Sequence, residues 1–592
     1  MSDKFTESIV EEAALIWLEA TGYTIRHGPE IAPEQPGAER ASYKEVLLVG
    51  RLRSALVRLN PALPAAAIDE AVRRLGRFDS PSLYTNNHTL HKLLIDGVPV
   101  SYQEKGRTVY KSARLLDFDP ATCRRTNDWL AVNQFTVTRL GAQANPDAQL
   151  EGTRRPDIVL FVNGLPLAVL ELKNPADEKA NVHSAYQQLQ TYKAEIPDLL
   201  AYNAALVVAD GVDARLGSLT GGFEWFKRWR SIDGEGLEQG CSLLETLIRG
   251  ALDPVRLLDL IRHFTFFEVT GAEIVKKIAQ YHQFFAANKA VQETLRAVGA
   301  AAGNAVDDAV GARGDRKAGV VWHTQGSGKS LTMLFYAGKI ILQPQMENPT
   351  IVVLTDRNDL DDQLLGNTFA PGHELLRQKP VQAKDRADLR ALLGATAAGG
   401  VIFTTIQKFL PDPGDNSNPT LSARRNIIFI VDEAHRSHYG FEARYITTNE
   451  QVREVYGLAK YLRDALPNAT FIGFTGTPVS KTDHDTRGVF GEYIDVYDIQ
   501  RAVDDAATVP IYIEARYAKM KLDERMAPRI DPEFDEVTEG EEETSKAWLQ
   551  SKWAQIAAVV GDLDRINLVA ADIVQHFELR TRRCRARPWS SA

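Results

Sequence analysis

The sequence predicts an α/β protein of several domains, with a compact mixed sheet in its first half and a parallel sheet covered by helices in its second. Three observations support this class. The chain has 592 residues, too many for one hydrophobic core on the usual scale of ~150 residues per domain. Residues 158–172 hold two apolar runs joined by Asn-Gly, a strong hairpin signal. From 319 to about 500, short apolar runs alternate with longer helical segments, which is typical of a parallel sheet with helices on both faces.

Composition and charge set the limits on function. With 44% hydrophobic and 25% charged residues, the chain resembles an ordinary globular protein. Its formal net charge of -9 means that any phosphate-binding surface must be a local groove, because the net field repels nucleic acid. The three cysteines, Cys123, Cys241 and Cys584, lack the spacing of a zinc site or a disulfide framework. They fit a reducing cytoplasm.

The first residues, MSDKFTESIVEEAALIWLEATGY, predict an amphipathic helix. Acidic residues stand where a secretory signal needs a basic region. No uninterrupted apolar run approaches the ~18 to 20 residues of a membrane span. We therefore expect a soluble cytoplasmic protein that makes no contact with a membrane.

The first candidate site lies in the predicted hairpin, which begins at Arg154-Arg155-Pro156-Asp157 and continues through Asn163-Gly164 to Glu171 and Lys173. Glu171 and Lys173 are two residues apart on a strand and therefore share one face. Asp157 joins that face only if the connection has an odd number of residues or the strand pair carries a bulge. Pro166 favours a longer, irregular connection.

Asp157, Glu171 and Lys173 are the groups that phosphodiester hydrolysis needs. Two carboxylates can hold Mg²⁺ against the scissile phosphate, while a lysine positions or activates water and offsets developing charge. An exposed hairpin with alternating charges is the alternative interpretation. A helix predicted over SAYQQLQTY places Gln188 and Tyr192 four residues apart on one face next to the hairpin, which favours the functional reading over an ordinary helix face.

The second candidate site begins with Gly326-Ser327-Gly328-Lys329-Ser330, between an apolar run and a helical segment. Glycines let backbone N–H groups turn toward phosphates, Lys329 supplies a positive charge, and Ser330 can coordinate Mg²⁺ at the helix N-terminus. His323 stands where the pattern G-x-x-x-x-G-K-S/T has its first glycine. A Gly-Ser turn with a surface lysine is the alternative.

A second acidic element supports a nucleotide site. The apolar run at 426–431 leads into Asp432-Glu433-Ala434-His435, at the carboxyl end of a predicted buried strand, where open α/β sheets bind ligands. Asp432 would hold Mg²⁺ on the β- and γ-phosphates of ATP, and Glu433 would orient or deprotonate the attacking water. A solvated helix start after a strand is the simpler alternative.

These elements, together with Thr475-Gly476-Thr477-Pro478, resemble the first RecA-like domain of superfamily 2 helicases and translocases. The resemblance implies that Thr475 and Thr477 couple hydrolysis to DNA movement and that Gln283 reads adenine, although a lone glutamine on a helix is more often merely exposed. It also implies that TDRNDLDDQ at 355–363 contacts a nucleic-acid strand.

The spacing of Asp157, Glu171, Lys173, Gln188 and Tyr192 resembles the PD-(D/E)-x-K nuclease of type I restriction subunits. In that family an N-terminal helix can add an acidic residue, for which Glu11 and Glu12 are the candidates; a solvated helix face explains them equally well. A nuclease that precedes the motor also matches type I restriction subunits, whereas type III subunits resemble the reverse order.

The resemblance implies three domains. They are a PD-(D/E)-x-K endonuclease domain at 1–260, a first RecA-like domain at 261–505, and an incomplete beginning of a second RecA-like domain at 506–592. We expect residues 298–319 and the acidic residues 531–545 to be surface loops. The last residues, LRTRRCRARPWSSA, break the family pattern. We interpret them as out-of-frame sequence after a truncation rather than as a basic DNA-binding tail formed by Arg580, Arg582, Arg583, Arg585 and Arg587.

The expected function is ATP-dependent translocation along double-stranded DNA coupled to Mg²⁺-dependent cleavage, in complex with methyltransferase and specificity subunits. We expect this chain to bind Mg-ATP weakly and not to translocate by itself. Two alternatives remain open: a DEAH-type helicase or repair translocase with a structural upstream domain, and a truncated remnant that binds partners or DNA without turnover.

Overall fold

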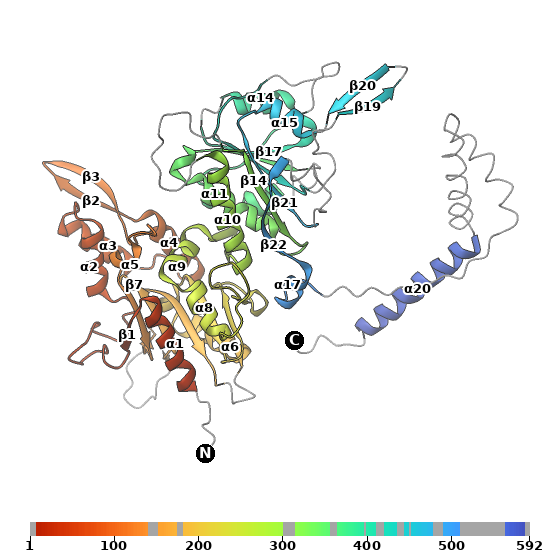
Figure 1. Cartoon of the computed structure of the whole chain (residues 1–592). Coiled ribbons are helices and arrows are strands. Elements are labelled where there is room, and N and C mark those ends of the chain that lie inside the picture. Colours follow the sequence, from red (N-terminus) through yellow and green to blue (C-terminus); the bar gives the residue numbers. More distant parts are fainter. Residues whose placement is uncertain are drawn as a thin grey trace. The chain divides into compact units, whose positions relative to one another are not determined.

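The computed structural model (Figure 1) describes residues 7–139, 152–174, 181–299, 314–355, 364–395, 398–409, 420–434, 443–448, 451–456, 458–477, 489–509 and 563–585. The chain divides into two compact units, residues 1–509 and 510–592. Within the described residues, the first unit holds two seven-stranded sheets. The α/β class is therefore confirmed.

The first sheet is mixed, with the strand order β1-β4-β7-β8-β9-β10-β11. Strands β7 and β8 pair antiparallel, and β8 and β9 pair parallel. Helix α6 packs against β8 and β9, so the predicted mixed sheet with a helix against it is confirmed. The strands are β1 (Thr24–His27), β4 (Trp129–Asn133), β7 (Ile158–Val162), β8 (Leu165–Leu172), β9 (Ala205–Ala209), β10 (Ala214–Gly217) and β11 (Lys227–Arg228).

Helices surround this sheet. The predicted N-terminal amphipathic helix is α1, and its Val10, Ala14 and Leu18 are buried. The main helices of this part are α1 (Glu7–Thr21), α2 (Val49–Leu59), α3 (Ala65–Leu75), α4 (Leu83–Asp96), α6 (Val182–Glu195), α8 (Leu243–Ala251) and α9 (Pro254–His263). Two hairpins, β2 (Val98–Glu104) with β3 (Arg107–Ala113) and β12 (Thr265–Thr270) with β13 (Glu273–Ile278), also belong to it, as does the short pair of β5 (Val137–Thr138) with β6 (Thr153–Arg154).

The β7–β8 hairpin turns on two residues, Asn163 and Gly164, with φ of 54° and 79°. These left-handed values are those of a tight hairpin turn. A Cβ on Gly164 would lie 2.5 Å from the carbonyl oxygen of Leu48, so α2 can approach this turn only at a glycine. The longer connection expected from Pro166 is wrong, because Pro166 already pairs with Phe161 in the strand.

The second sheet is parallel throughout, in the order β16-β17-β15-β18-β21-β14-β22. Along β15, Ile351 and Val353 face one hydrophobic core, while Val352 and Leu354 face another. Helices α10 and α11 contribute to the first core, and α14 and α15 to the second, which confirms helices on both faces. The strands are β14 (Lys317–His323), β15 (Thr350–Thr355), β16 (Val381–Gln382), β17 (Val401–Thr405), β18 (Ile427–Asp432), β21 (Thr470–Thr475) and β22 (Tyr493–Tyr497).

The longer helices of this part are α10 (Tyr281–Val298), α11 (Lys329–Ile341), α14 (Arg386–Ala395) and α15 (Leu458–Ala465), with short α13 (His373–Leu376) and α17 (Ile499–Asp504). A separate hairpin joins β19 (Ala443–Thr448) to β20 (Gln451–Tyr456). Residues 300–313 of the expected surface loop, the acidic stretch 531–545 and residues 356–363 of the expected strand-contacting motif lie outside the described residues.

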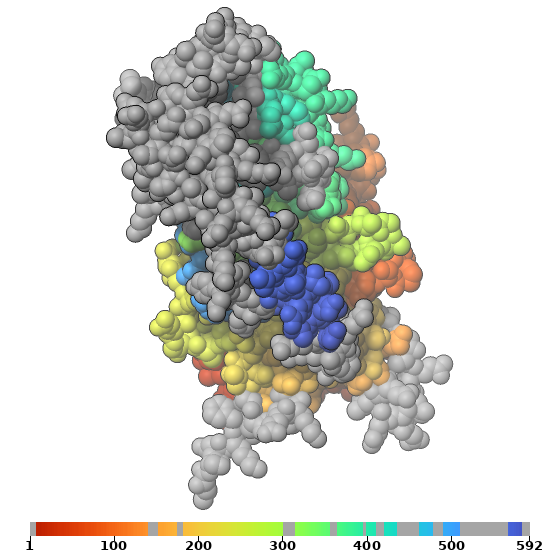
Figure 2. Space-filling model, turned by 90° about the vertical axis from the view of Figure 1, so that its right-hand side faces the viewer, coloured from red at the N-terminus to blue at the C-terminus, as the bar shows by residue number. Residues whose placement is uncertain are grey.

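In the second unit, α20 (Leu563–Arg585) is the described element, and it is blue in Figure 2. It includes Arg580, Arg582, Arg583 and Arg585, so the helix continues well into the sequence that breaks the family pattern; Arg587 lies outside the described residues. Within the described ranges, no helix is long and apolar enough to cross a membrane.

Candidate functional site

A β-bulge brings Asp157 onto the same face of the sheet as Glu171 and Lys173; these residues form the first candidate site, here named the front site. The register of β7 and β8 shifts by one residue between Leu160 and Phe161, and Ile158 then pairs with Leu170. Continuing this register places Asp157 opposite Glu171, so that both side chains share a face. The sequence predicted that Asp157 would join the face of Glu171 only through a connection with an odd number of residues or a bulge. The structure has the bulge.

Glu171 is the centre of this site. Its side chain is 3% exposed, and Lys173 Nζ lies 2.6 Å from its Oε1. The hydroxyl of Tyr192 donates a hydrogen bond of 2.9 Å to the other oxygen, Oε2, and Gln188 Nε2 donates to the Tyr192 hydroxyl at 3.4 Å. The structure thus brings together the four residues that the sequence placed on strand and helix.

Burial is the main reason that the pKa of Tyr192 is raised, and the negative charge of Glu171 adds to it. Asp157 contributes in the same direction. The phenol therefore stays protonated and acts as a hydrogen-bond donor. Helix α6 holds it in place: Asn181 caps the helix through its side chain, and Tyr192 is on the buried face.

Asp157 is 9% exposed, and its Oδ2 accepts a 2.7 Å hydrogen bond from the backbone N–H of Leu172. Glu11 of α1 is linked to the same region: its two oxygens accept from Asn133 Nδ2 at 2.7 Å and from Gln134 Nε2 at 2.8 Å. The Gln134 N–H donates to the carbonyl of Asp157. Glu12 is exposed, so Glu11 is the acidic residue that the first helix turns toward the sheet.

The donor set suits a hard cation, because carboxylate oxygens are the ligands that Mg²⁺ prefers. Asp157 and Glu171 are two buried carboxylates on one face, and Lys173 provides a counter-charge. Among the residues that the structure describes, no group of three or more His, Cys, Asp or Glu could hold a metal ion. A cation here would therefore take its protein ligands from the two carboxylates, with water or substrate in the remaining positions.

The second site is the loop between β14 and α11. Gly326 and Gly328 both have a φ of 82°, and α11 begins at Lys329. The first backbone N–H groups of a helix have no partner within it and favour an anion. A Cβ on Gly328 would lie 2.5 Å from Gln283 Nε2, so a larger residue would also disturb the glutamine beneath the loop.

Three elements meet at the Lys329 ammonium. Its Nζ lies 3.1 Å from Glu433 Oε1, directly after β18. A Cβ on Gly476, after β21, would lie 2.6 Å from the same Nζ, and the Gly476 N–H points to Glu433 Oε2 at 3.5 Å. The backbone of Glu433 has a φ of 51°, a strained conformation for a residue with a side chain and one that is often found at functional sites.

The remaining predicted residues lie around this centre. Asp432 Oδ1 accepts from the Glu433 N–H at 2.9 Å. Thr475 and Thr477 form a compact turn, since the Thr475 hydroxyl donates to the Thr477 carbonyl and accepts from its N–H. Ser327 is buried and its hydroxyl donates to the Thr324 carbonyl. Ser330 is the second residue of α11.

Gln283 is buried rather than exposed. Its Nε2 donates to the Gly328 carbonyl at 3.2 Å, and its Oε1 accepts from the Gln280 N–H. Gln283 therefore contacts the loop between β14 and α11 directly.

Sequence reasoning missed the support beneath the loop. His282 Nε2 contacts the Ser327 carbonyl at 2.9 Å, and its ring stacks on Tyr497 at 3.9 Å. Burial lowers the pKa of His282 to about 3. His323, which replaces the usual glycine, is fully buried and contacts Asp495 at 3.0 Å. No sequence pattern indicates that Tyr497 and Asp495, which come from the distant strand β22, lie beside these histidines.

Comparisons with known proteins find two matching family models. A family model described as the N terminus of the type I restriction enzyme R protein matches residues 4–225, and one described as SWI2/SNF2 ATPase matches residues 282–547. The type I restriction enzyme HindI endonuclease subunit of Haemophilus influenzae is 43% identical over 97% of this chain and 51% of the relative.

A relative from Methanocaldococcus jannaschii with the provisional name type I restriction enzyme MjaIXP endonuclease subunit is 33% identical over 97% of this chain and 52% of the relative. The SsaAORF53P endonuclease subunit of Staphylococcus saprophyticus is 24% identical over 81% of this chain and 46% of the relative. The chain spans about half the length of these curated relatives. Over that half, the chain belongs to the family of type I restriction enzyme endonuclease subunits.

Proposed function

We propose that the chain carries the nuclease and part of the motor of a type I restriction enzyme, which translocates double-stranded DNA at the expense of ATP and cuts both strands with Mg²⁺. The observation that carries the proposal is the cluster of buried Glu171 and Tyr192 with half-buried Lys173, in a part of the chain that precedes an ATPase domain. The named relatives are endonuclease subunits, so we also propose methyltransferase and specificity subunits as partners, and the cytoplasm as location.

In the front site, Asp157 and Glu171 would hold Mg²⁺. The metal, when bound, polarises the scissile phosphate and lowers the pKa of water. Lys173 is near enough to Glu171 to position the attacking water and to offset the developing charge. Tyr192, with Gln188 behind it, keeps the Glu171 carboxylate in one orientation. We assign this domain, residues 1–260, to the PD-(D/E)-x-K nucleases.

In the second site, Lys329, the N–H groups at the start of α11 and the turns at Gly326 and Gly328 would hold the phosphates of ATP. Ser330 and Asp432 would hold its Mg²⁺, which neutralises charge on the β- and γ-phosphates. Glu433 would orient or deprotonate the attacking water, and Lys329 lies against it at 3.1 Å.

Because Gly476 contacts this pair, the turn from Thr475 to Thr477 would respond to ATP hydrolysis and couple it to DNA movement. Gln283 would read adenine while it supports the loop. We assign residues 261–505 to a first RecA-like domain and 506–592 to the beginning of a second.

The decisive experiment replaces Asp157 or Lys173 with alanine and measures DNA cleavage and ATP turnover in the assembled complex. We expect cleavage to be lost while DNA-stimulated ATP hydrolysis continues. The matched control is Glu12→Ala, an exposed carboxylate one residue from Glu11, which should leave both activities unchanged. Undiminished cutting by both site variants would instead favour a DEAH-type helicase or repair translocase with a structural front domain.

A further inference from the structure

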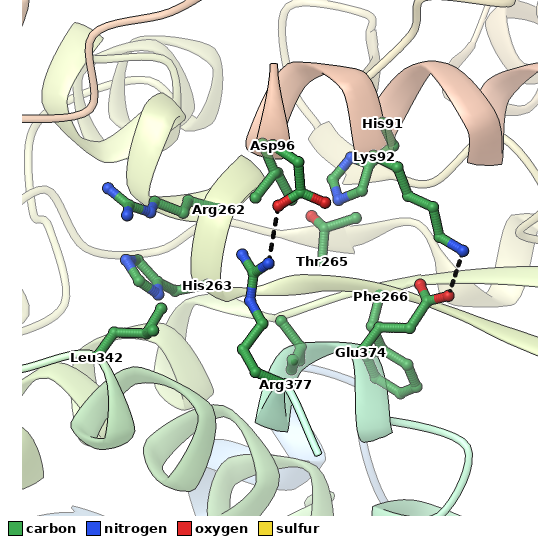
Figure 3. A pocket seen from close by; sticks show the side chains of 12 residues that line it. His91, Lys92, Asp96, Arg262, His263, Thr265, Phe266, Leu342, Glu374 and Arg377 are labelled. Carbon is green, nitrogen blue, oxygen red and sulfur yellow. Dashed lines mark hydrogen bonds and ion pairs between the residues drawn. The ribbon is translucent and has the colours of Figure 1, made fainter. Parts of the chain in front are cut away.

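A cavity of about 290 Å³ lies in the first unit where α4, α9 and β12 meet α13 (Figure 3). It shares no residue with either candidate site. Helices α4 and α9 precede the parallel sheet in the chain, whereas α13 lies between its strands β15 and β16. The cavity is therefore walled by both parts of the unit.

Both carboxylates that line the cavity already have cationic partners. Lys92 Nζ lies 2.6 Å from Glu374 Oε1, and Arg377 Nη1 lies 2.8 Å from Asp96 Oδ1. Figure 3 shows that the two cations come from opposite sides: Lys92 reaches from α4 to α13, and Arg377, directly after α13, reaches to Asp96 at the end of α4. His88 contacts the other Glu374 oxygen at 3.1 Å. Neither carboxylate is thus left to neutralise a third cation.

Arg262 is that third cation. Its guanidinium packs over the ring of Phe118 at 5.1 Å, and its buried Nε has no hydrogen-bond partner among the described residues. His91, which is 6% exposed and also lines the cavity, has no partner at either ring nitrogen within the described part of the chain. Buried polar atoms are seldom left without a partner unless water or a ligand supplies one.

Among the described residues that line the cavity, the cations Lys92, Arg262 and Arg377 outnumber the carboxylates of Asp96 and Glu374. Burial and then the nearby Arg377 lower the pKa of Arg262, while the negative charge of Asp259 acts in the opposite direction. Burial and then the cations Lys339, Arg262 and Arg377 lower the pKa of His263 well below its usual value. An anion in the cavity would relieve this repulsion, and neutral imidazoles could still donate one N–H each.

We propose that this cavity binds a small phosphate-bearing molecule, no larger than a mononucleotide, with Arg262 and His91 as donors. A guanidinium matches the geometry and charge of a phosphate. The volume is near the lower end for small-molecule pockets and is too small for a duplex. Since its walls come from both parts of the unit, an occupant would hold the front domain against the ATPase domain. The proposal does not depend on the function proposed above.

The test is calorimetric titration of the full chain with inorganic phosphate and with AMP, in EDTA and on a Lys329→Ala background that removes binding at the phosphate loop. We expect one saturable site for at least one of these probes. Arg262→Gln should weaken binding about ten- to a hundredfold, because a charge-assisted hydrogen bond is lost. The matched control is Arg249→Gln on α8, whose exposed guanidinium pairs with Glu245, and it should bind as tightly as the background.

A His91→Phe variant provides a second test if Arg262→Gln does not fold, because it removes both ring nitrogens and keeps an aromatic ring. Absence of saturable binding up to about 10 mM of either probe would overturn the proposal. The proposal would also be overturned if Arg262→Gln or His91→Phe bound phosphate and AMP as tightly as the background. It would likewise be overturned if Arg262→Gln weakened binding of a short DNA duplex but not binding of phosphate or AMP.

Discussion

Replacing Lys173 with methionine tests what holds the front site together. Lys173 Nζ lies 2.6 Å from Glu171 Oε1, and the two side chains are 18% and 3% exposed. Removing one partner of a buried ion pair costs roughly 3–5 kcal/mol, because the other charge stays buried without compensation. The Tyr192 hydroxyl still donates to Glu171 Oε2 at 2.9 Å, so we expect the lower end, about 3 kcal/mol.

Hydrogen exchange of strand β8 measures this cost locally, without requiring the whole chain to unfold in one step. A loss of about 3 kcal/mol should speed exchange of its amides roughly a hundredfold in the absence of divalent metal. The matched control is Lys92→Met, whose ion pair with Glu374 is 50% and 29% exposed and is worth at most about 1 kcal/mol.

Added Mg²⁺ should restore part of the protection in the Lys173→Met variant, because a bound cation would replace the lost ammonium beside Glu171. If β8 exchanges no faster in Lys173→Met than β8 does in Lys92→Met, the Lys173–Glu171 pair does not hold the strand and the reasoning is refuted. If Mg²⁺ changes nothing, the metal assignment loses its support.

Three further predictions concern the second site and the buried core. Gly476→Ala should displace the Lys329 ammonium, 2.6 Å from the added Cβ, and weaken ATP binding about tenfold or more. Gly394→Ala, with open space around the added Cβ, should bind ATP as the unchanged chain does. Equal ATP affinities of the two variants would contradict the contact between Gly476 and Lys329. Glu433→Gln should retain nucleotide binding but lower turnover at least about a hundredfold, measured as phosphate release; unchanged turnover would remove Glu433 from the chemistry. Burial lowers the pKa of Lys276 to about 7 from 10.5, so the unfolded chain holds more protons between these values and the free energy of unfolding should rise with pH there, by up to about 1.4 kcal/mol per pH unit. Lys276→Met should flatten that slope in denaturant titrations, and an unaltered slope would show that another group causes it.

The local patterns were sufficient for the elements that carry both sites. A run of apolar residues predicted β18, and its carboxyl end does deliver Asp432 and Glu433 beside the glycine-rich loop. Helical spacing placed Gln188 and Tyr192 on one face of α6, and both lie beside Glu171. These predictions succeed because strand and helix periodicity is set by the chain itself over a few residues.

The sequence by itself determined the α/β class, the glycine-rich loop between strand and helix, and the residue types of both sites. The tertiary structure decided that a bulge, and not a long turn, brings Asp157 opposite Glu171. It also decided that Glu11, and not Glu12, faces the sheet. It alone revealed that His282, stacked on Tyr497, supports the glycine-rich loop. Register shifts and contacts between distant strands depend on how whole elements pack, and no local periodicity records that packing.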